Sequence, residues 1–232
     1  MSEFSNPVQN VTFASNGDEA YGYLALPASG NGSAVIVVQE WWGLTTHVAH
    51  MSDRLAGEGY VALAPDLYGG ATAHDEGEAL QMLLEIPVDR AARDLRGAVD
   101  YLLARDEVVG ETVGVVGFCM GGSFALQLAV QEGGNVAAVV AFYPIGYMPD
   151  DYAGLQAAVL IHIPDADQIN PPTLAEELNE KISADTGRKP EIDHYPAGHA
   201  FLNEEDLLGT YDAEQARIAW DRTVAFLRVH LG

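Results

Sequence analysis

Continuous apolar runs alternate with amphipathic stretches along most of this chain. The apolar runs are typical of strands covered on both faces and lie at residues 34–39, 60–64, 113–117, 136–142 and 157–163, with a final short strand expected at 191–195. Stretches with helical patterning lie between and after these runs, at residues 46–57, 89–105, 123–130, 171–183 and 212–231. This alternation predicts an α/β fold, with a mostly parallel central sheet flanked by helices on both faces.

Two segments fall outside the alternation. Residues 11–14 and 21–26 flank Asn16 and Gly17, which tolerate positive φ, so the chain is predicted to open with an antiparallel hairpin. Residues 71–87 are predicted to form a polar loop that merges into a short helix, and the pattern leaves open whether this segment is a lid. A chain of 232 residues without internal repeats indicates one domain over residues 1–232.

The charge of the chain excludes several classes of partner. It carries 34 acidic residues against 11 basic ones, for a formal net charge of −23, and the acids are spread along the whole sequence. Binding to nucleic acid or to an anionic membrane needs a concentrated basic face, so we expect neither partner. The polar residues 1–6 lack the basic and apolar regions of a signal peptide, and no apolar run approaches the roughly 20 residues that span a bilayer. We therefore expect a cytoplasmic protein, as a monomer or weak homodimer.

The single cysteine of the chain stands between a predicted strand and a predicted helix. Gly117, Cys119 and Gly121 have the spacing of a nucleophile elbow, with cysteine in the place of the usual serine. At a helix N-terminus, the dipole and the free N–H groups favour the reactive thiolate. One cysteine also excludes an intramolecular disulfide and a cysteine-rich metal site. The alternative is that Cys119 is a small buried apolar residue.

A cysteine nucleophile needs a base and a group that orients the base. His199 follows the last predicted strand directly and is the best-placed base, although a histidine in such a loop is also compatible with simple solvent exposure. Asp165 and Asp167 follow the strand at 157–163, and Asp167, in the loop that leads to the next helix, is the expected orienting acid. Turn formation or helix capping is the alternative role for this aspartate. The order cysteine, aspartate, histidine is that of α/β hydrolases.

The remaining histidines have less favourable positions. His162 and His194 lie inside predicted strands, where a hydrogen-bonded structural role is expected.

Stabilising an oxyanion requires two backbone N–H groups. The residue after the nucleophile, Met120, is the expected first donor, and Trp41, in the loop after an early strand, is the expected second. Glu40 stands between an apolar strand end and two tryptophans, where burial would raise the pKa of its carboxyl group and suit it to proton transfer. A surface glutamate is the alternative.

Taken together, these stretches resemble the dienelactone hydrolase family of α/β hydrolases over nearly the whole chain. The resemblance is carried by Gln39-Glu-Trp-Trp-Gly-Leu44, Gly59-Tyr-Val-Ala-Leu-Ala-Pro-Asp-Leu-Tyr68, Gly117-Phe-Cys-Met-Gly-Gly122, the spacing from Asp167 to Pro171, and Gly198-His-Ala-Phe201. It implies an α/β-hydrolase fold and hydrolysis of an ester or enol lactone, with no metal or organic cofactor.

The resemblance also implies roles for individual residues. Cys119 would be the nucleophile, His199 the base and Asp167 its orienter, with a thioester intermediate that is hydrolysed by water activated by His199. Glu40 would interact with the resting thiol and accept its proton when substrate displaces it. The N–H groups of Trp41 and Met120 would bind the oxyanion.

The sequence departs from the family in its cations. Members that open dienelactone hold its carboxylate with two arginines, but residues 69–89 contain no arginine or lysine here, and Asn203 occupies the second place. A carboxylesterase or thioesterase acting on neutral esters is therefore an alternative, as is a non-catalytic thiol-sensing or binding module. Trp42, Tyr143 and Phe201 are expected to line an apolar substrate pocket, although aromatic residues at these positions are equally typical of a core.

Overall fold

The computed structural model describes residues 5–232, so residues 1–4 of the opening segment lie outside the described part. The chain divides into two compact units, with the boundary between Gly114 and Val115. Each unit is described below by itself, and a single domain over residues 1–232 stays a prediction. Among the helices of residues 5–232, none combines the length and the apolar character needed to cross a membrane.

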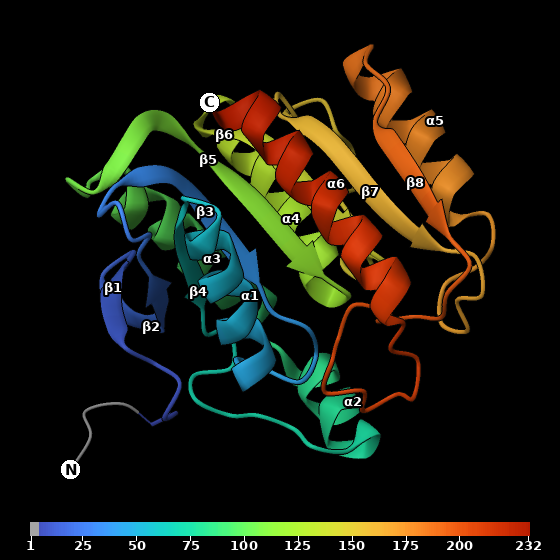
Figure 1. The fold of residues 1–232 in the computed structure, drawn as a ribbon, viewed down its shortest axis with the longest axis horizontal. Coiled ribbons are helices and arrows are strands. Elements are labelled where there is room, and N and C mark those ends of the chain that lie inside the picture. The colour runs from blue at the N-terminus through green and yellow to red at the C-terminus, as the bar shows by residue number, and fades with distance from the viewer. Residues whose placement is uncertain (1–4) are drawn as a thin grey trace. The chain divides into compact units, whose positions relative to one another are not determined.

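The first unit holds four strands in the order β1-β2-β4-β3 (Figure 1). The strands are β1 (Val11–Ser15), β2 (Asp18–Ala25), β3 (Gly32–Val38) and β4 (Val61–Pro65), and the helices are α1 (Thr46–Gly57), α2 (Glu76–Glu85) and α3 (Val88–Leu103). β1 pairs with β2 and β2 with β4 in antiparallel fashion, whereas β3 and β4 are parallel. α1 contacts β2, β3 and β4, and α3 contacts β1, β3 and β4.

Both unusual segments of the first unit form as predicted. β1 and β2 are an antiparallel hairpin whose turn residues, Asn16 and Gly17, have φ of 47° and 95°. The helical part of residues 71–87 is α2, which begins where the Asp75 side chain accepts hydrogen bonds from the N–H groups of Gly77 and Glu78. A capping aspartate thus ends the loop at a defined residue.

The second unit holds the strand order β5-β6-β7-β8, with β5 beginning before the unit boundary. Its elements are β5 (Val108–Phe118), α4 (Met120–Glu132), the 3-10 turn Gly133–Asn135, β6 (Val136–Phe142), β7 (Ala158–Pro164), α5 (Leu174–Thr186), β8 (Glu191–Tyr195) and α6 (Ala213–Leu231). β6 pairs with β7 and β7 with β8 in parallel. α4 and α6 both contact β6, and Figure 1 shows α6 in front of this part of the sheet and α4 behind it. The predicted parallel sheet with helices on both faces is confirmed for this unit.

One predicted helix begins later than expected. The pattern predicts helix from residue 171, but α5 begins at Leu174. The reason is the pair Pro171-Pro172, because a proline disfavours helical backbone in the residue before it.

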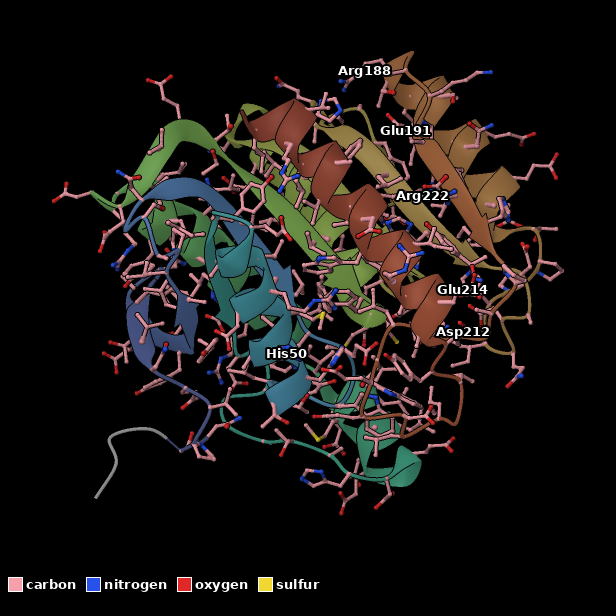
Figure 2. All side chains as sticks on the ribbon, viewed as in Figure 1. His50, Arg188, Glu191, Asp212, Glu214 and Arg222 are labelled. Carbon is pink, nitrogen blue, oxygen red and sulfur yellow. The ribbon has the colours of Figure 1, made fainter. Side chains whose placement is uncertain are left out.

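His162, on β7, is part of a buried hydrogen-bond chain, in agreement with the structural role predicted for it. Its Nδ1 lies 2.7 Å from the Tyr195 hydroxyl and its Nε2 lies 2.9 Å from Oγ1 of Thr223. Arg222, labelled on α6 in Figure 2, donates to the Tyr195 oxygen over 3.2 Å and pairs with Asp193. In the neutral ring one nitrogen donates and the other accepts, so these two hydroxyl groups satisfy both ring nitrogens of His162. Burial, together with the charge of Arg222, lowers the pKa of His162 to about 3.

The low pKa of His162 in the folded chain predicts that the protein loses stability in mild acid. Below pH 6.5 the unfolded chain protonates His162 while the folded chain does not until about pH 3, so the free energy of unfolding falls as the pH is lowered through this window. The expected contribution is about 2 kcal/mol between pH 7 and pH 5. Chemical denaturation at several pH values measures the free energy of unfolding, which should depend less on pH in His162→Gln than in wild type. His194→Gln, which replaces an exposed histidine, is the control and should keep the wild-type pH dependence. Equal slopes for wild type and His162→Gln would contradict the assignment.

Candidate active site

The strand-to-helix turn around Cys119 has strained backbone. β5 ends at Phe118, α4 begins at Met120, and Cys119 between them has φ 55° and ψ −123°. The preceding glycine is required, because a Cβ at Gly117 would lie 2.0 Å from the carbonyl oxygen of Gly121. This close approach gives a physical reason for glycine two residues before the cysteine. The Cys119 side chain thus stands at the N-terminus of a 13-residue helix.

His199 and Asp167 form a buried pair in the same unit. The Nδ1 atom of His199 lies 2.9 Å from Oδ2 of Asp167, and the two side chains are only 3% and 6% exposed. Because a carboxylate only accepts hydrogen bonds, Nδ1 carries the proton and Nε2 is left with its lone pair. Nε2 is buried without a hydrogen-bond partner among residues 5–232. The histidine therefore presents an oriented basic nitrogen, which is the form a general base requires.

The segment after β6 lies against both the cysteine and the histidine. The N–H of Cys119 donates to the carbonyl of Phe142 over 3.0 Å, and the N–H of Ile145 donates to the carbonyl of Cys119 over 3.2 Å. Between them, the ring of Tyr143 packs against the ring of His199, with centroids 4.9 Å apart. Residues 142–145 thus bring the turn that carries Cys119 and the loop that carries His199 to one region of the unit.

The Asp167 carboxylate accepts more hydrogen bonds than the one from His199. Its Oδ1 accepts from the N–H groups of Ile169 and Asn170, over 2.8 and 3.0 Å, and its Oδ2 also accepts from the side-chain amide of Asn170 over 3.1 Å. Burial raises the pKa of Asp167, but the His199 interaction and the backbone N–H groups outweigh it and lower that pKa overall. Asn170 was not identified from the sequence, where its position directly before Pro171 was the only available signal.

The alternative orienting acid has a different partner. Asp165 lies 2.7 Å from Nδ1 of His194, and both side chains are about half exposed. The second unit therefore contains two aspartate–histidine pairs, of which only the Asp167–His199 pair is buried.

The pocket residues of the second unit are buried. Tyr143 and Phe201 have no exposed surface, and their rings lie 5.7 Å apart at a steep angle. This packing agrees with the core role that the sequence left open, and their place in a substrate pocket stays a prediction.

In the first unit, the three predicted site residues follow β3 directly. Glu40 and Trp42 are buried, and the rings of Trp41 and Trp42 meet edge to face with centroids 5.1 Å apart. Glu40 is thus buried, as expected from the sequence, and is not a surface glutamate. Its role in proton transfer, and that of the Trp41 N–H in binding an oxyanion, stay predictions.

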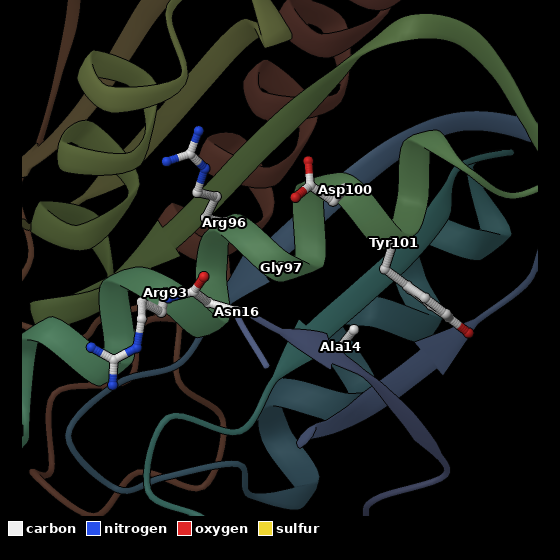
Figure 3. Close-up of a pocket in the computed structure, with 7 residues that line it drawn as sticks. All are labelled: Ala14, Asn16, Arg93, Arg96, Gly97, Asp100 and Tyr101. Atoms are coloured by element: carbon white, nitrogen blue, oxygen red, sulfur yellow. The ribbon is translucent and has the colours of Figure 1, made fainter. Parts of the chain in front are cut away.

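A cavity of about 450 Å³ in the first unit contains none of the predicted site residues (Figure 3). It lies over Gly97 of α3 and is lined by Ala14, Asn16, Arg93, Arg96, Gly97, Asp100 and Tyr101. Figure 3 shows the side chains of Arg93 and Arg96 pointing away from one another, so they do not form a joint binding site for an anion. Within residues 5–232 no group of three or more His, Cys, Asp or Glu side chains is arranged to hold a metal ion.

Comparison with known proteins decides the family. A model of the dienelactone hydrolase family matches residues 20–231. The chain belongs to the dienelactone hydrolase family. Among its relatives, Protein usf of Aquifex pyrophilus is 32% identical over 96% of this chain and 99% of its own length, and a carboxymethylenebutenolidase of a Pseudomonas species is 29% identical over 93% of this chain and 92% of its own.

The solved structures agree with this membership of the dienelactone hydrolase family. A crystal structure of a putative dienelactone hydrolase from Klebsiella pneumoniae has a TM-score of 0.83 and 28% identity, covering 94% of this chain and 96% of its own. The predicted α/β-hydrolase fold is confirmed. As a dienelactone hydrolase family member, the protein is a hydrolase acting on ester or lactone bonds.

Proposed function

We propose that this protein cleaves an ester or enol-lactone bond with Cys119 as nucleophile, His199 as base and Asp167 as the group that orients His199. The observation that carries the proposal is the buried His199–Asp167 pair, which leaves Nε2 of His199 basic and without a partner among the described residues. The strained turn that presents Cys119 at the start of α4 supports the same assignment.

The first half of the reaction transfers the acyl group to sulfur. The helix N-terminus favours the thiolate, so Cys119 releases its proton to solvent water. The thiolate attacks the carbonyl carbon, so that a C–S bond forms and the carbonyl electron pair moves onto oxygen. Met120 is the first residue of α4, and backbone N–H groups at a helix N-terminus favour negative charge, so we assign its N–H to stabilise this oxyanion. The intermediate then collapses, the C–O bond to the leaving group breaks, and the departing alkoxide or enolate takes a proton from solvent water.

The second half hydrolyses the thioester. Nε2 of His199 removes a proton from water, whose oxygen attacks the thioester carbonyl. Asp167 holds the resulting imidazolium through Nδ1. Collapse of the second tetrahedral intermediate breaks the C–S bond, releases the carboxylic acid and returns the thiolate. The imidazolium of His199 then gives its proton to solvent, which restores the starting state.

The recognition of a substrate carboxylate differs from the pattern that the resemblance implies. Asn203, at the place of one expected arginine, is buried, and its side-chain oxygen accepts the N–H of Glu205. Arg90, in the first unit, follows directly after residues 69–89, where the first arginine was expected. Its guanidinium lies near Gly69, 3.5 Å from where a Cβ on that glycine would be, but it also pairs with Asp94. We therefore propose the bond type, ester or enol lactone, and not a particular acid.

The experiment that tests this function compares three substrates of the purified protein. They are a dienelactone, a neutral aryl ester, and the anilide with the same acyl group as that ester. We expect hydrolysis of at least one of the two ester-type substrates and much slower cleavage of the anilide, because an amine leaves from the tetrahedral intermediate less readily than the thiolate does. Failure to cleave both ester-type substrates, or cleavage of the anilide at the rate of the ester, would contradict the proposal.

A further inference from the structure

We propose that Asn170 is a positioning residue for this reaction, whose side-chain amide fixes the oxygen of Asp167 that holds His199. This inference rests on the proposed roles of His199 and Asp167. Asn170 touches neither the reacting atoms nor Cys119 in any described contact, so its action passes through the carboxylate.

The division of hydrogen bonds between the two oxygens of Asp167 supports this role. Oδ1 is held by the main chain, through the N–H groups of Ile169 and Asn170. Oδ2, which faces His199 at 2.9 Å, has one other donor, the Asn170 amide at 3.1 Å. Among the described contacts, Asn170 is therefore the residue that fixes the working oxygen independently of the histidine.

A neutral donor suits this position because His199 changes its charge during the proposed cycle. The attraction between Asp167 and His199 is stronger when the imidazole is protonated and weaker when it is neutral. An amide does not titrate, so the hydrogen bond from Asn170 keeps Oδ2 in place in both states. This constancy keeps the imidazole plane oriented when the neutral ring must accept a proton from water.

The backbone around Asn170 fixes its side chain. The residue precedes Pro171, which restricts it to extended conformations, and its own N–H is held by Oδ1 of the same aspartate. Asn170 thus binds both oxygens of Asp167, one through the main chain and one through the side chain. Because its backbone is already held by Pro171 and by Oδ1, Asn170 loses little further conformational entropy when its side chain binds Oδ2.

The surroundings of Asn170 explain why a donor is needed there. Asp167 and Asn170 line a cavity of about 90 Å³, next to Pro171 and to the hydrogen-bonded pair Asp165 and His194. Asp165 and His194 bind each other at 2.7 Å and, with His199, are the titratable groups that border this site in the described residues. Without the amide, a water from this cavity would have to replace Asn170 as the second donor to Oδ2 and would lose entropy on binding there.

The test uses Asn170→Ala, Asn170→Asp and the control Gln168→Ala, whose exposed side chain lies two residues away. In Asn170→Ala we expect kcat to fall about 10- to 100-fold with little change in KM, as for other partners that orient a functional side chain. Asn170→Asp keeps the shape but removes the donor and adds a like charge, so it should lose at least as much activity. Gln168→Ala should match wild type.

A readout without turnover separates this inference from the proposed function. In the Cys119→Ala background, the NMR signal of the His199 Nδ1 proton reports the Asp167–His199 hydrogen bond directly, and Asn170→Ala should shift or broaden it. Wild-type kcat and a wild-type Nδ1 signal in folded Asn170→Ala would overturn the role of Asn170 alone. Hydrolysis that survives Cys119→Ala would overturn the proposed function, and this role with it.

Discussion

Replacing Cys119 by alanine abolishes hydrolysis of the preferred ester or lactone, with kcat/KM reduced by at least about a thousandfold. The reason is that no covalent intermediate forms when the sulfur is absent. Cys119 is 2% exposed, and alanine removes one atom without adding a polar group, so the variant is expected to fold and unfold near the wild-type temperature. Steady-state kinetics beside thermal unfolding measures both effects.

Ser123 provides the matched control for this variant. It lies one turn into α4, and its hydroxyl donates to the carbonyl of Ile145, which makes it a second nucleophilic side chain close in sequence to the elbow. Ser123→Ala should keep most of the activity. Full activity in Cys119→Ala, or loss of activity only in Ser123→Ala, would show that the nucleophile has been assigned wrongly.

His199→Ala should lower turnover about a thousandfold, which is within the range expected for loss of a general base. We assign this histidine as the base for thioester hydrolysis because it pairs with buried Asp167 and its Nε2 has no partner among residues 5–232. With a reactive aryl ester, the variant is expected to acylate Cys119 and then to stall, because water is no longer activated. A burst of leaving group followed by very slow turnover is the kinetic signature.

The second aspartate–histidine pair supplies the control for His199→Ala. His194 binds Asp165 at 2.7 Å as His199 binds Asp167 at 2.9 Å, but it is half exposed. If hydrogen bonding to an aspartate were sufficient, His194→Ala would impair hydrolysis as well. We expect wild-type rates from His194→Ala, and a loss equal to that of His199→Ala would contradict the assignment.

The predictions that succeeded depended on local patterns. Apolar runs and glycine punctuation gave β6, β7 and β8 nearly to the residue, and Gly117 with Cys119 gave the strained turn at the start of α4. Such features are encoded by residues close together in the sequence, because strand length and backbone conformation are local properties.

The features that the sequence did not give depend on contacts between distant segments. The partners of His162 come from β8 and α6, 33 and 61 residues away along the chain, so no spacing rule could name them. The choice of Asp167 over Asp165 rested on its position in the loop, and both aspartates prove to bind a histidine. Asn170 is close to Asp167, but the orientation of its amide depends on the turn at Pro171.

The central claim is that the acyl group is carried on the sulfur of Cys119. The most direct test is mass spectrometry of wild-type protein and His199→Ala, each quenched with acid shortly after mixing with an aryl ester, followed by peptide mapping. The account predicts one added acyl group per chain, on the peptide that contains Cys119, removed by hydroxylamine and more abundant in His199→Ala. Turnover without any adduct, or an adduct on another residue such as Ser123, would contradict it.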